Sequence, residues 1–141
     1  MLGAFAVGID RTLEQDPLLA LALLGEVGRR ALSPGINDPG TAIECLNYAE
    51  DLLLRALVPR TTGPATAAGR VRMVPLAPAR FLEAAIVGIA RGGRGFPEVA
   101  ARVQSVLAAL AVRVDDATRE VVRETAASLP RAREGLSDRA G

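Results

Sequence analysis

Five stretches of this chain carry apolar residues at the three- and four-residue spacing that lines one face of an α-helix. Proline or aspartate begins each stretch, and glycine or proline follows several of them, as is typical of helix boundaries. Half of the residues are hydrophobic but only 3% are aromatic, so the core must be built from closely spaced Leu, Val, Ile and Ala. The sequence therefore predicts a mainly α fold, a compact bundle of about five helices over residues 16–32, 39–57, 78–91, 97–110 and 115–129.

The first of these helices contains the most apolar run of the chain, residues 18–24. This run carries no charge, although it is only about a third of the length needed to span a bilayer. Pro17 fits the first turn of a helix, and Arg29 and Arg30 fit its C-terminal end, where cations are favoured. We expect a helix that is buried on most sides and lies at the centre of the bundle.

Two other segments lack helical spacing. Residues 2–9 are small and apolar, and residues 70–76 begin by alternating arginine with apolar side chains, as short half-buried strands do. They predict a small two-stranded β element, a minor α+β feature beside the helices. Because 141 residues fit one domain of common size, we expect a single helical domain over residues 1–130. Residues 131–141 are polar and have no apolar stripe, which predicts a frayed or disordered tail.

The charged and sulfur-containing residues exclude several classes of function. Arginine supplies all 17 cations against 16 anions, so the formal charge is only +1 and no strong field would attract nucleic acid. The chain has no lysine and no histidine, which leaves carboxylates as the only plausible general bases. The single cysteine, Cys45, rules out an intrachain disulfide and a cysteine-rich metal site. Its place on a predicted helix indicates a buried thiol rather than a nucleophile.

The beginning of the chain, residues 1–9, is apolar. It lacks the basic flank and the length of a signal peptide or a membrane span. We therefore expect the chain to be soluble and cytoplasmic, and to be associated with a membrane only through a segment that lies outside it.

The turn between the first two helices, residues 33–41, is the segment with the densest group of polar side chains. Helix capping explains much of it. Gly35 can adopt the left-handed conformation that ends a helix, Asp38 can cap the next helix, and Pro39 fits its first position. Asp16 can cap the first helix in the same way.

The polar side chains that capping leaves over could instead form a pocket. Carboxylates from two loops could bind a hard cation such as Mg²⁺ or divide acid and base roles between them. No spacing here matches an EF-hand, a P-loop or a zinc motif, so we expect no catalytic residue and no cofactor, with a divalent cation as the alternative. The candidate ligand-binding residues are Arg11, Glu14, Asp16, Ser33, Asn37, Asp38 and Thr41. The candidate metal ligands are Asp16, Asp38 and Glu44.

Two arginines among glycines, Arg91 and Arg94, precede the fourth helix. They could bind an anion at the N-terminus of that helix, which carries partial positive charge. A solvated surface explains them more simply, and we favour that interpretation. Arg131 and Arg133 are interpreted in the same way, as part of an exposed tail.

Two blocks of the sequence resemble a known family. They read Arg-Thr-Leu-Glu-Gln-Asp at residues 11–16 and Ala-Leu-Ser-Pro-Gly-Ile-Asn-Asp-Pro at residues 31–39. The blocks are similar to those of the bacterial predicted membrane proteins filed as domain of unknown function 2254. The resemblance covers most of the chain and implies transmembrane helices ahead of this region, but it implies no established activity. The chain departs from the family pattern at Ala20, Ala22 and Leu23, where the family tends to have Gly, Arg and Gln.

These observations favour a regulatory or assembly module. Five helices, several of them apolar on two sides, offer more hydrophobic face than a small bundle can easily bury. We expect a homo-oligomer, with a membrane protein or a missing transmembrane region as the alternative partner and with no nucleic acid. A ligand- or divalent-metal-binding sensor with its site at the turn of residues 33–41 is the alternative function. An enzyme is the least favoured class.

Overall fold

The computed structural model describes residues 15–59 and 77–131, and all five predicted helices are confirmed within these ranges. The third predicted helix is continuous but not uniform, because a π-helical segment interrupts its α-helical hydrogen bonding, and a 3₁₀ turn follows its end. The elements are α2 (Pro17–Ala31), α3 (Pro39–Leu57), α4 (Pro78–Leu82), the π-helical segment η1 (Glu83–Val87), α5 (Gly88–Gly92), the 3₁₀ turn η2 (Gly93–Gly95), α6 (Pro97–Arg113) and α7 (Asp116–Ser128).

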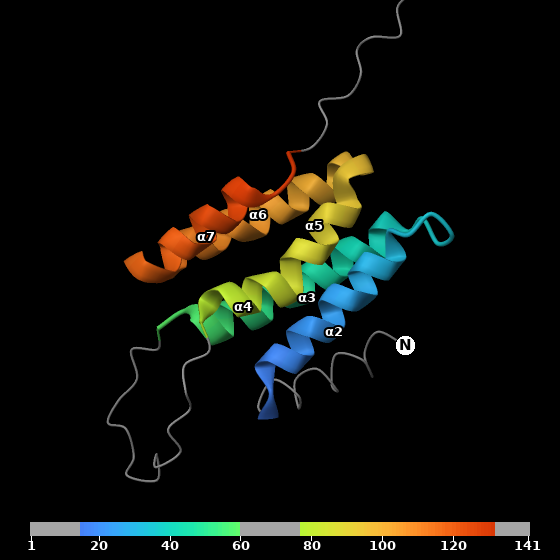
Figure 1. Ribbon diagram of the computed structural model, residues 1–141. Coiled ribbons are helices and arrows are strands. Elements are labelled where there is room, and N and C mark those ends of the chain that lie inside the picture. The colour runs from blue at the N-terminus through green and yellow to red at the C-terminus, as the bar shows by residue number, and fades with distance from the viewer. Residues whose placement is uncertain (1–14, 60–76, 132–141) are drawn as a thin grey trace, which may run out of the picture.

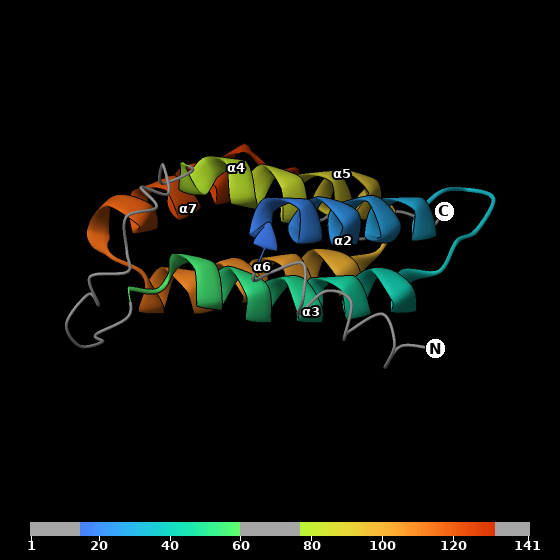
Figure 2. The same cartoon turned by 90° about the horizontal axis from the view of Figure 1, so that it is seen from below.

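The helices form two layers (Figure 2). One layer holds α2, the continuous helix from α4 through α5, and α7, while the other holds α3 and α6. Following the chain, α2 packs on α3, α3 on α6, and α6 on α7, and the α4–α5 helix lies between α7 and α2 (Figure 1). Helix α2 therefore forms one edge of the described bundle, not its centre.

Aliphatic side chains from every helix fill the space between the layers, as the low aromatic content requires. The residues that are most completely buried come from the predicted stripes, and they include several leucines and valines of α2, α3 and α6. Phe81 is the only buried aromatic side chain among the described residues. The fully buried large side chains are Leu21, Leu24, Leu46, Leu52, Leu53, Leu82, Ile86, Ile89, Leu110, Val99, Val103 and Val106.

The expectation that α2 is buried on most sides is wrong. Leu19 is 49% exposed, Leu23 is 48% exposed and Val27 is 37% exposed. The helix buries the opposite face, which includes Leu21 and Leu24, against α3 and the α4–α5 helix. Among residues 15–59 and 77–131, α2 has neighbours on one side only, so its apolar sequence does not bury its whole circumference.

Two glycines set how closely α2 approaches its neighbours. A Cβ atom added to Gly25 would lie 2.0 Å from the carbonyl oxygen of Ala84, which belongs to η1. A Cβ atom on Gly28 would lie 2.4 Å from Cδ1 of Ile89. Both distances are far below van der Waals contact. At Gly25 the neighbour is backbone, so only glycine permits this approach, whereas at Gly28 the neighbour is a flexible side chain.

Two arginines link the other helices. The guanidinium of Arg102 on α6 forms an ion pair with Glu50 on α3 and donates to Oδ1 of Asn47 at 2.7 Å. The guanidinium of Arg119 on α7 donates to the carbonyl oxygens of Ala111 and Val114 at 2.6 and 3.0 Å. It thereby satisfies carbonyls at the C-terminal end of α6, which have no partner within that helix, and fixes the turn between α6 and α7.

The predicted two-stranded β element finds no support. Its two segments, residues 2–9 and 70–76, lie outside the residues that the structure describes, and residues 15–59 and 77–131 contain no strand. The fold of the described residues is therefore helical throughout its regular elements. All of the expected tail of residues 131–141 except Arg131 also lies outside the described ranges.

Candidate functional site

The turn after α2 is closed by its own backbone. The carbonyl oxygen of Ser33 accepts from the N–H groups of Ile36 at 3.0 Å and Asn37 at 2.8 Å. The N–H of Asp38 donates back to the carbonyl oxygen of Ala31 at 2.7 Å. These bonds use polar groups that the end of a helix leaves unpaired, so the geometry of the turn follows from helix termination.

The left-handed residue of this turn is Asn37, with φ of 52°, and not Gly35 as expected. Every described glycine has a negative φ, including Gly35. Asparagine tolerates the left-handed region better than other residues with a side chain, because its short amide can bond locally. Asn37 is therefore accounted for by the path of the backbone.

Both predicted aspartate caps are confirmed. Oδ1 of Asp16 accepts from the N–H of Leu19 at 3.0 Å, at the start of α2. At the start of α3, the carboxylate of Asp38 accepts from the N–H of Thr41 at 3.1 Å and from its hydroxyl at 2.6 Å. The hydroxyl of Thr41 and then its N–H lower the pKa of Asp38 below its ordinary value, because both bonds favour the charged carboxylate.

The structure does not bring the candidate metal ligands together. Asp16 and Asp38 lie at opposite ends of α2, a 15-residue helix that is about 22 Å long at 1.5 Å per residue. Glu44 is exposed on α3. Within the described ranges, no group of three or more cysteine, aspartate or glutamate side chains could hold a metal ion. Arg11 and Glu14 lie outside these ranges, so the turn itself gathers only Ser33, Asn37, Asp38 and Thr41.

The thiol of Cys45 on α3 is only 4% exposed, which confirms the predicted burial. Burial, and to a lesser degree the negative charge of Glu44, raises the pKa of Cys45 to about 11. Since the thiolate is the reactive form, a thiol that stays protonated at neutral pH is a poor nucleophile. Cys45 is therefore part of the core and not a reactive site.

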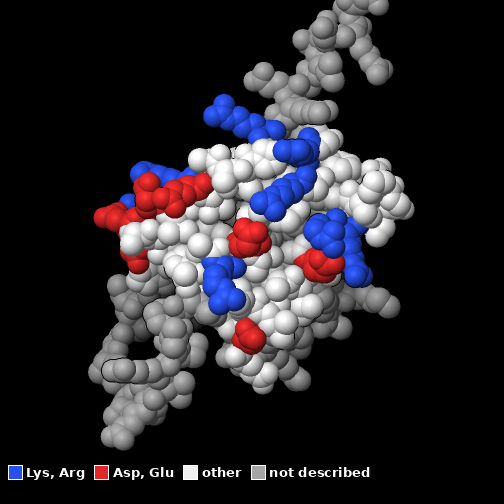
Figure 3. All heavy atoms as spheres, viewed as in Figure 1, with Lys and Arg blue, Asp and Glu red and all other residues white. Residues whose placement is uncertain are grey.

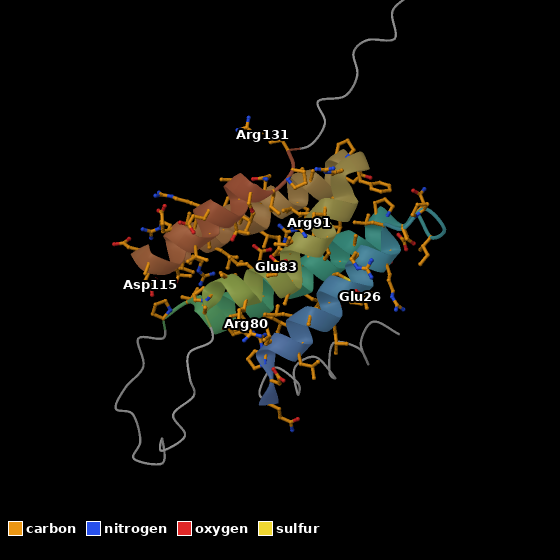
Figure 4. All side chains as sticks on the ribbon, viewed as in Figure 1. Glu26, Arg80, Glu83, Arg91, Asp115 and Arg131 are labelled. Atoms are coloured by element: carbon orange, nitrogen blue, oxygen red, sulfur yellow. The ribbon has the colours of Figure 1, made fainter. Side chains whose placement is uncertain are left out.

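The glycine-rich end of α5 borders a shallow pocket of about 160 Å³ at the N-terminus of α6. Arg94, Gln104 and Pro130 are among the residues that line it, and its walls are mainly apolar. Arg91 and Arg94 are both exposed, in agreement with the solvated surface expected for them. Figure 4 shows Arg91 on the side of the α4–α5 helix together with Arg80 and Glu83, so this helix presents charges of both signs.

Helix α2 presents an exposed apolar surface, which helical periodicity alone does not identify. Leu19, Leu23 and Val27 follow one another at four-residue steps and therefore form a row along one side of the helix. Ala22 is exposed beside this row, and no charged residue occurs between Asp16 and Glu26. We call Leu19, Leu23 and Val27 the outer row of α2. On the face seen in Figure 3, uncharged surface separates the charges at the two ends of this helix.

The charges at the C-terminal end of α2 are paired with one another. Glu26 accepts from Arg29 at 2.7 Å and from Arg30 at 3.0 Å. The bonds from Arg29 and then Arg30 lower the pKa of Glu26 below its ordinary value. The outer row thus lies between an aspartate at one end of the helix and an arginine-rich cluster at the other.

A signal for the outer row was present in the sequence. Gly25 and Gly28 identify the face of α2 that packs closely on its neighbours, and a helical projection places Leu23 almost opposite Gly25. The glycines therefore marked the buried face, and the leucines on the other side remained available for the surface.

Comparison with known proteins places the chain in a family. The family model described as "Predicted membrane protein (DUF2254)" matches residues 1–109. Uncharacterized proteins of Mycobacterium bovis and Mycobacterium tuberculosis are 30% identical over 127 residues, which cover 87% of this chain and 24% of theirs. The chain thus spans about a quarter of the length of the curated relatives that it matches. No solved structure matches it.

None of the helices in the described part of the chain is both long and apolar enough to cross a membrane. The match extends over more than three quarters of the residues, from the first residue to the last part of α6. Both sequence blocks that resembled the family fall inside it. The chain belongs to the DUF2254 family of predicted membrane proteins.

Proposed function

We propose that these helices form a protein-interaction module that assembles through the outer row of α2. The observation that carries the proposal is the exposure of Leu19, Leu23 and Val27 in one continuous line on an edge helix. Single exposed aliphatic residues are common on protein surfaces, but an aligned group is typical of a contact surface. The one charge within the span of the outer row, Glu26, is paired with Arg29 and Arg30.

The free energy available from this surface is modest. Complete burial of a leucine or valine side chain contributes about 1.5–3 kcal/mol, so a residue that is already half buried has roughly 1 kcal/mol left to gain. Three such residues on each of two surfaces would give about 6 kcal/mol in total, from which the cost of association must be subtracted. The expected contact is therefore weak and dynamic between separate molecules.

Weak contacts suit a module that is attached to something larger. The curated relatives are about four times as long as the region that they share with this chain, and the family is described as one of predicted membrane proteins. Attachment to a common support raises the effective concentration of neighbouring modules to about the millimolar range. Under that condition, a net interaction of about 4 kcal/mol is sufficient to assemble them, because it corresponds to a Kd of about 1 mM.

Native mass spectrometry tests this proposal, because one spectrum reports the number of subunits and any retained ion or small molecule. We expect a protein complex whose abundance rises with concentration, and we expect Leu23→Gln to reduce it while leaving the helix content unchanged. Val112→Gln is the matched control, since Val112 is 80% exposed but lies on α6. A chain that stays monomeric at all concentrations, or a complex equally abundant in Leu23→Gln, would contradict the proposal.

A ligand-binding or metal-dependent role for the turn of residues 33–41 has less support. Its backbone bonds and the cap of Asp38 account for much of the polar character of this turn. Binding of a ligand or a divalent cation there, the absence of enzyme activity and a cytoplasmic location stay predictions.

A further inference from the structure

We infer that the outer row of α2 binds a second copy of this chain, with the two α2 helices antiparallel and related by a two-fold axis at Leu23. This inference rests on the proposed function and names its partner and geometry. A two-fold contact uses the same surface on both copies, so the surface must be complementary to itself after rotation. The residues of α2 meet that condition.

The outer row is symmetric about its middle residue. Leu19 lies four residues before Leu23, and Val27 lies four residues after it. When two copies of the row run in opposite directions, Leu23 meets Leu23 of the other copy and each Leu19 meets a Val27. Every large apolar side chain of the row then contacts another one.

The charges at the ends of α2 follow the same symmetry. Asp16 lies seven residues before Leu23 and Arg30 lies seven residues after it, on nearly the same side of the helix. The side chain of Arg30 is 72% exposed, and Asp16 is also exposed. An antiparallel pair places each Asp16 next to an Arg30 of the other copy, whereas a parallel pair would place like charges together.

The middle of the contact contains one charged residue, Glu26 beside Val27, and this carboxylate is already paired with Arg29 and Arg30. The segment from Pro17 to Gly25 contains no charged residue, and the small side chain of Ala22 beside Leu23 permits close approach of the two helices. Antiparallel helices also place the positive end of one helix dipole beside the negative end of the other. Apolar contact, end charges and dipoles therefore all favour the same orientation.

Disulfide cross-linking of the full chain tests this geometry. The native thiol is first removed by Cys45→Ala, and retention of the fold is checked by circular dichroism. Single variants Leu23→Cys, Leu19→Cys and Val27→Cys are then oxidised alone and in mixtures. A disulfide requires Cα atoms within about 7 Å, while two Leu19 positions in the antiparallel pair are separated by roughly 12 Å along the helix axis.

We expect Leu23→Cys to form a covalent dimer by itself, and Leu19→Cys to form one only when mixed with Val27→Cys. Val112→Cys is the control and should remain monomeric. A dimer formed by Leu19→Cys alone would show a parallel contact and overturn the inference.

The failure of this inference can be separated from that of the proposed function. If no cysteine variant cross-links but native mass spectrometry still shows a complex that Leu23→Gln abolishes, the antiparallel geometry is wrong and the interaction surface stands. If the chain is monomeric in both experiments, the interaction surface itself is wrong.

Discussion

Replacement of Gly25 with alanine tests how α2 packs against the α4–α5 helix. The added Cβ would lie 2.0 Å from the carbonyl oxygen of Ala84 and 3.1 Å from its carbonyl carbon. Both atoms belong to backbone, which cannot rotate away as a side chain can. Since non-bonded heavy atoms prefer about 3.5 Å or more, the two helices would have to separate by more than about 1 Å.

Two opposing effects determine how much Gly25→Ala changes the free energy of unfolding. Alanine is favoured over glycine by up to about 1 kcal/mol inside a helix. Overpacking of a well-filled contact costs about 1–3 kcal/mol and sometimes more, and a clash with rigid backbone belongs at the upper end. We therefore expect Gly25→Ala to lower the free energy of unfolding by about 2 kcal/mol.

Two other glycines provide a graded comparison. At Gly28 the clash is with Cδ1 of Ile89, the end of a flexible side chain, so Gly28→Ala should cost less than Gly25→Ala. At Gly88 the added Cβ would meet only Cδ of Arg29 at 3.5 Å, which is ordinary contact. Gly88→Ala should therefore stabilise the protein by about 0.5–1 kcal/mol through helix propensity.

Urea unfolding, monitored by circular dichroism, measures the free energy of unfolding of the three variants. A loss of about 2 kcal/mol corresponds to a midpoint roughly 1 M lower, because small proteins lose about 1–3 kcal/mol per molar urea. If Gly25→Ala proves as stable as Gly88→Ala, the close approach of α2 to Ala84 is wrong.

Three further predictions concern single polar or sulfur-containing side chains. Arg102→Gln should lower the free energy of unfolding by about 1–2 kcal/mol in urea titrations, because it leaves the partly buried Glu50 without its ion pair. The double variant with Glu50→Gln should recover part of this lost stability. A thiol reagent should modify Cys45 about 100-fold more slowly in the folded chain than in urea, because burial raises its pKa from 9.0 to about 11; equal rates would contradict its burial. Asp38→Ala should lose about 1 kcal/mol at neutral pH, whereas Asp38→Asn should stay near wild type because it keeps a capping oxygen. Because the folded-state pKa of Asp38 lies below 3.8, its stabilisation is present above pH 3.8 and is lost as the pH falls through the lower value, and Asp38→Asn should lack this loss in pH-dependent urea titrations.

The positions of the helices could be predicted because their boundaries are encoded locally. The Asp-Pro pairs at residues 16–17 and 38–39 supply a cap and a preset first dihedral, and the structure uses both. The π-helical segment η1 could not be predicted in this way. Its hydrogen-bond register occurs where Gly25 of α2 meets Ala84, and local propensity does not describe such a tertiary contact.

The candidate site was harder to predict for two reasons. Asp16 and Asp38 cannot share a metal ion, because the helix between them keeps them about 22 Å apart. The sequence predicts this helix, so it also argues against grouping the two aspartates. The exposure of Leu23 depends on which helix lies at the edge of the bundle. Because α2 is apolar on almost every side, periodicity alone did not distinguish its buried face from its outer row.

Sedimentation equilibrium of the purified chain over a wide concentration range tests the central claim most directly. The outer row of α2 predicts that the average mass of the wild type and of Val112→Gln rises toward twice the monomer mass. It predicts that the double variant Leu19→Gln/Leu23→Gln remains monomeric and folded over the same range. If the double variant associates as the wild type does, or if the wild type stays monomeric throughout, α2 is not an interaction surface.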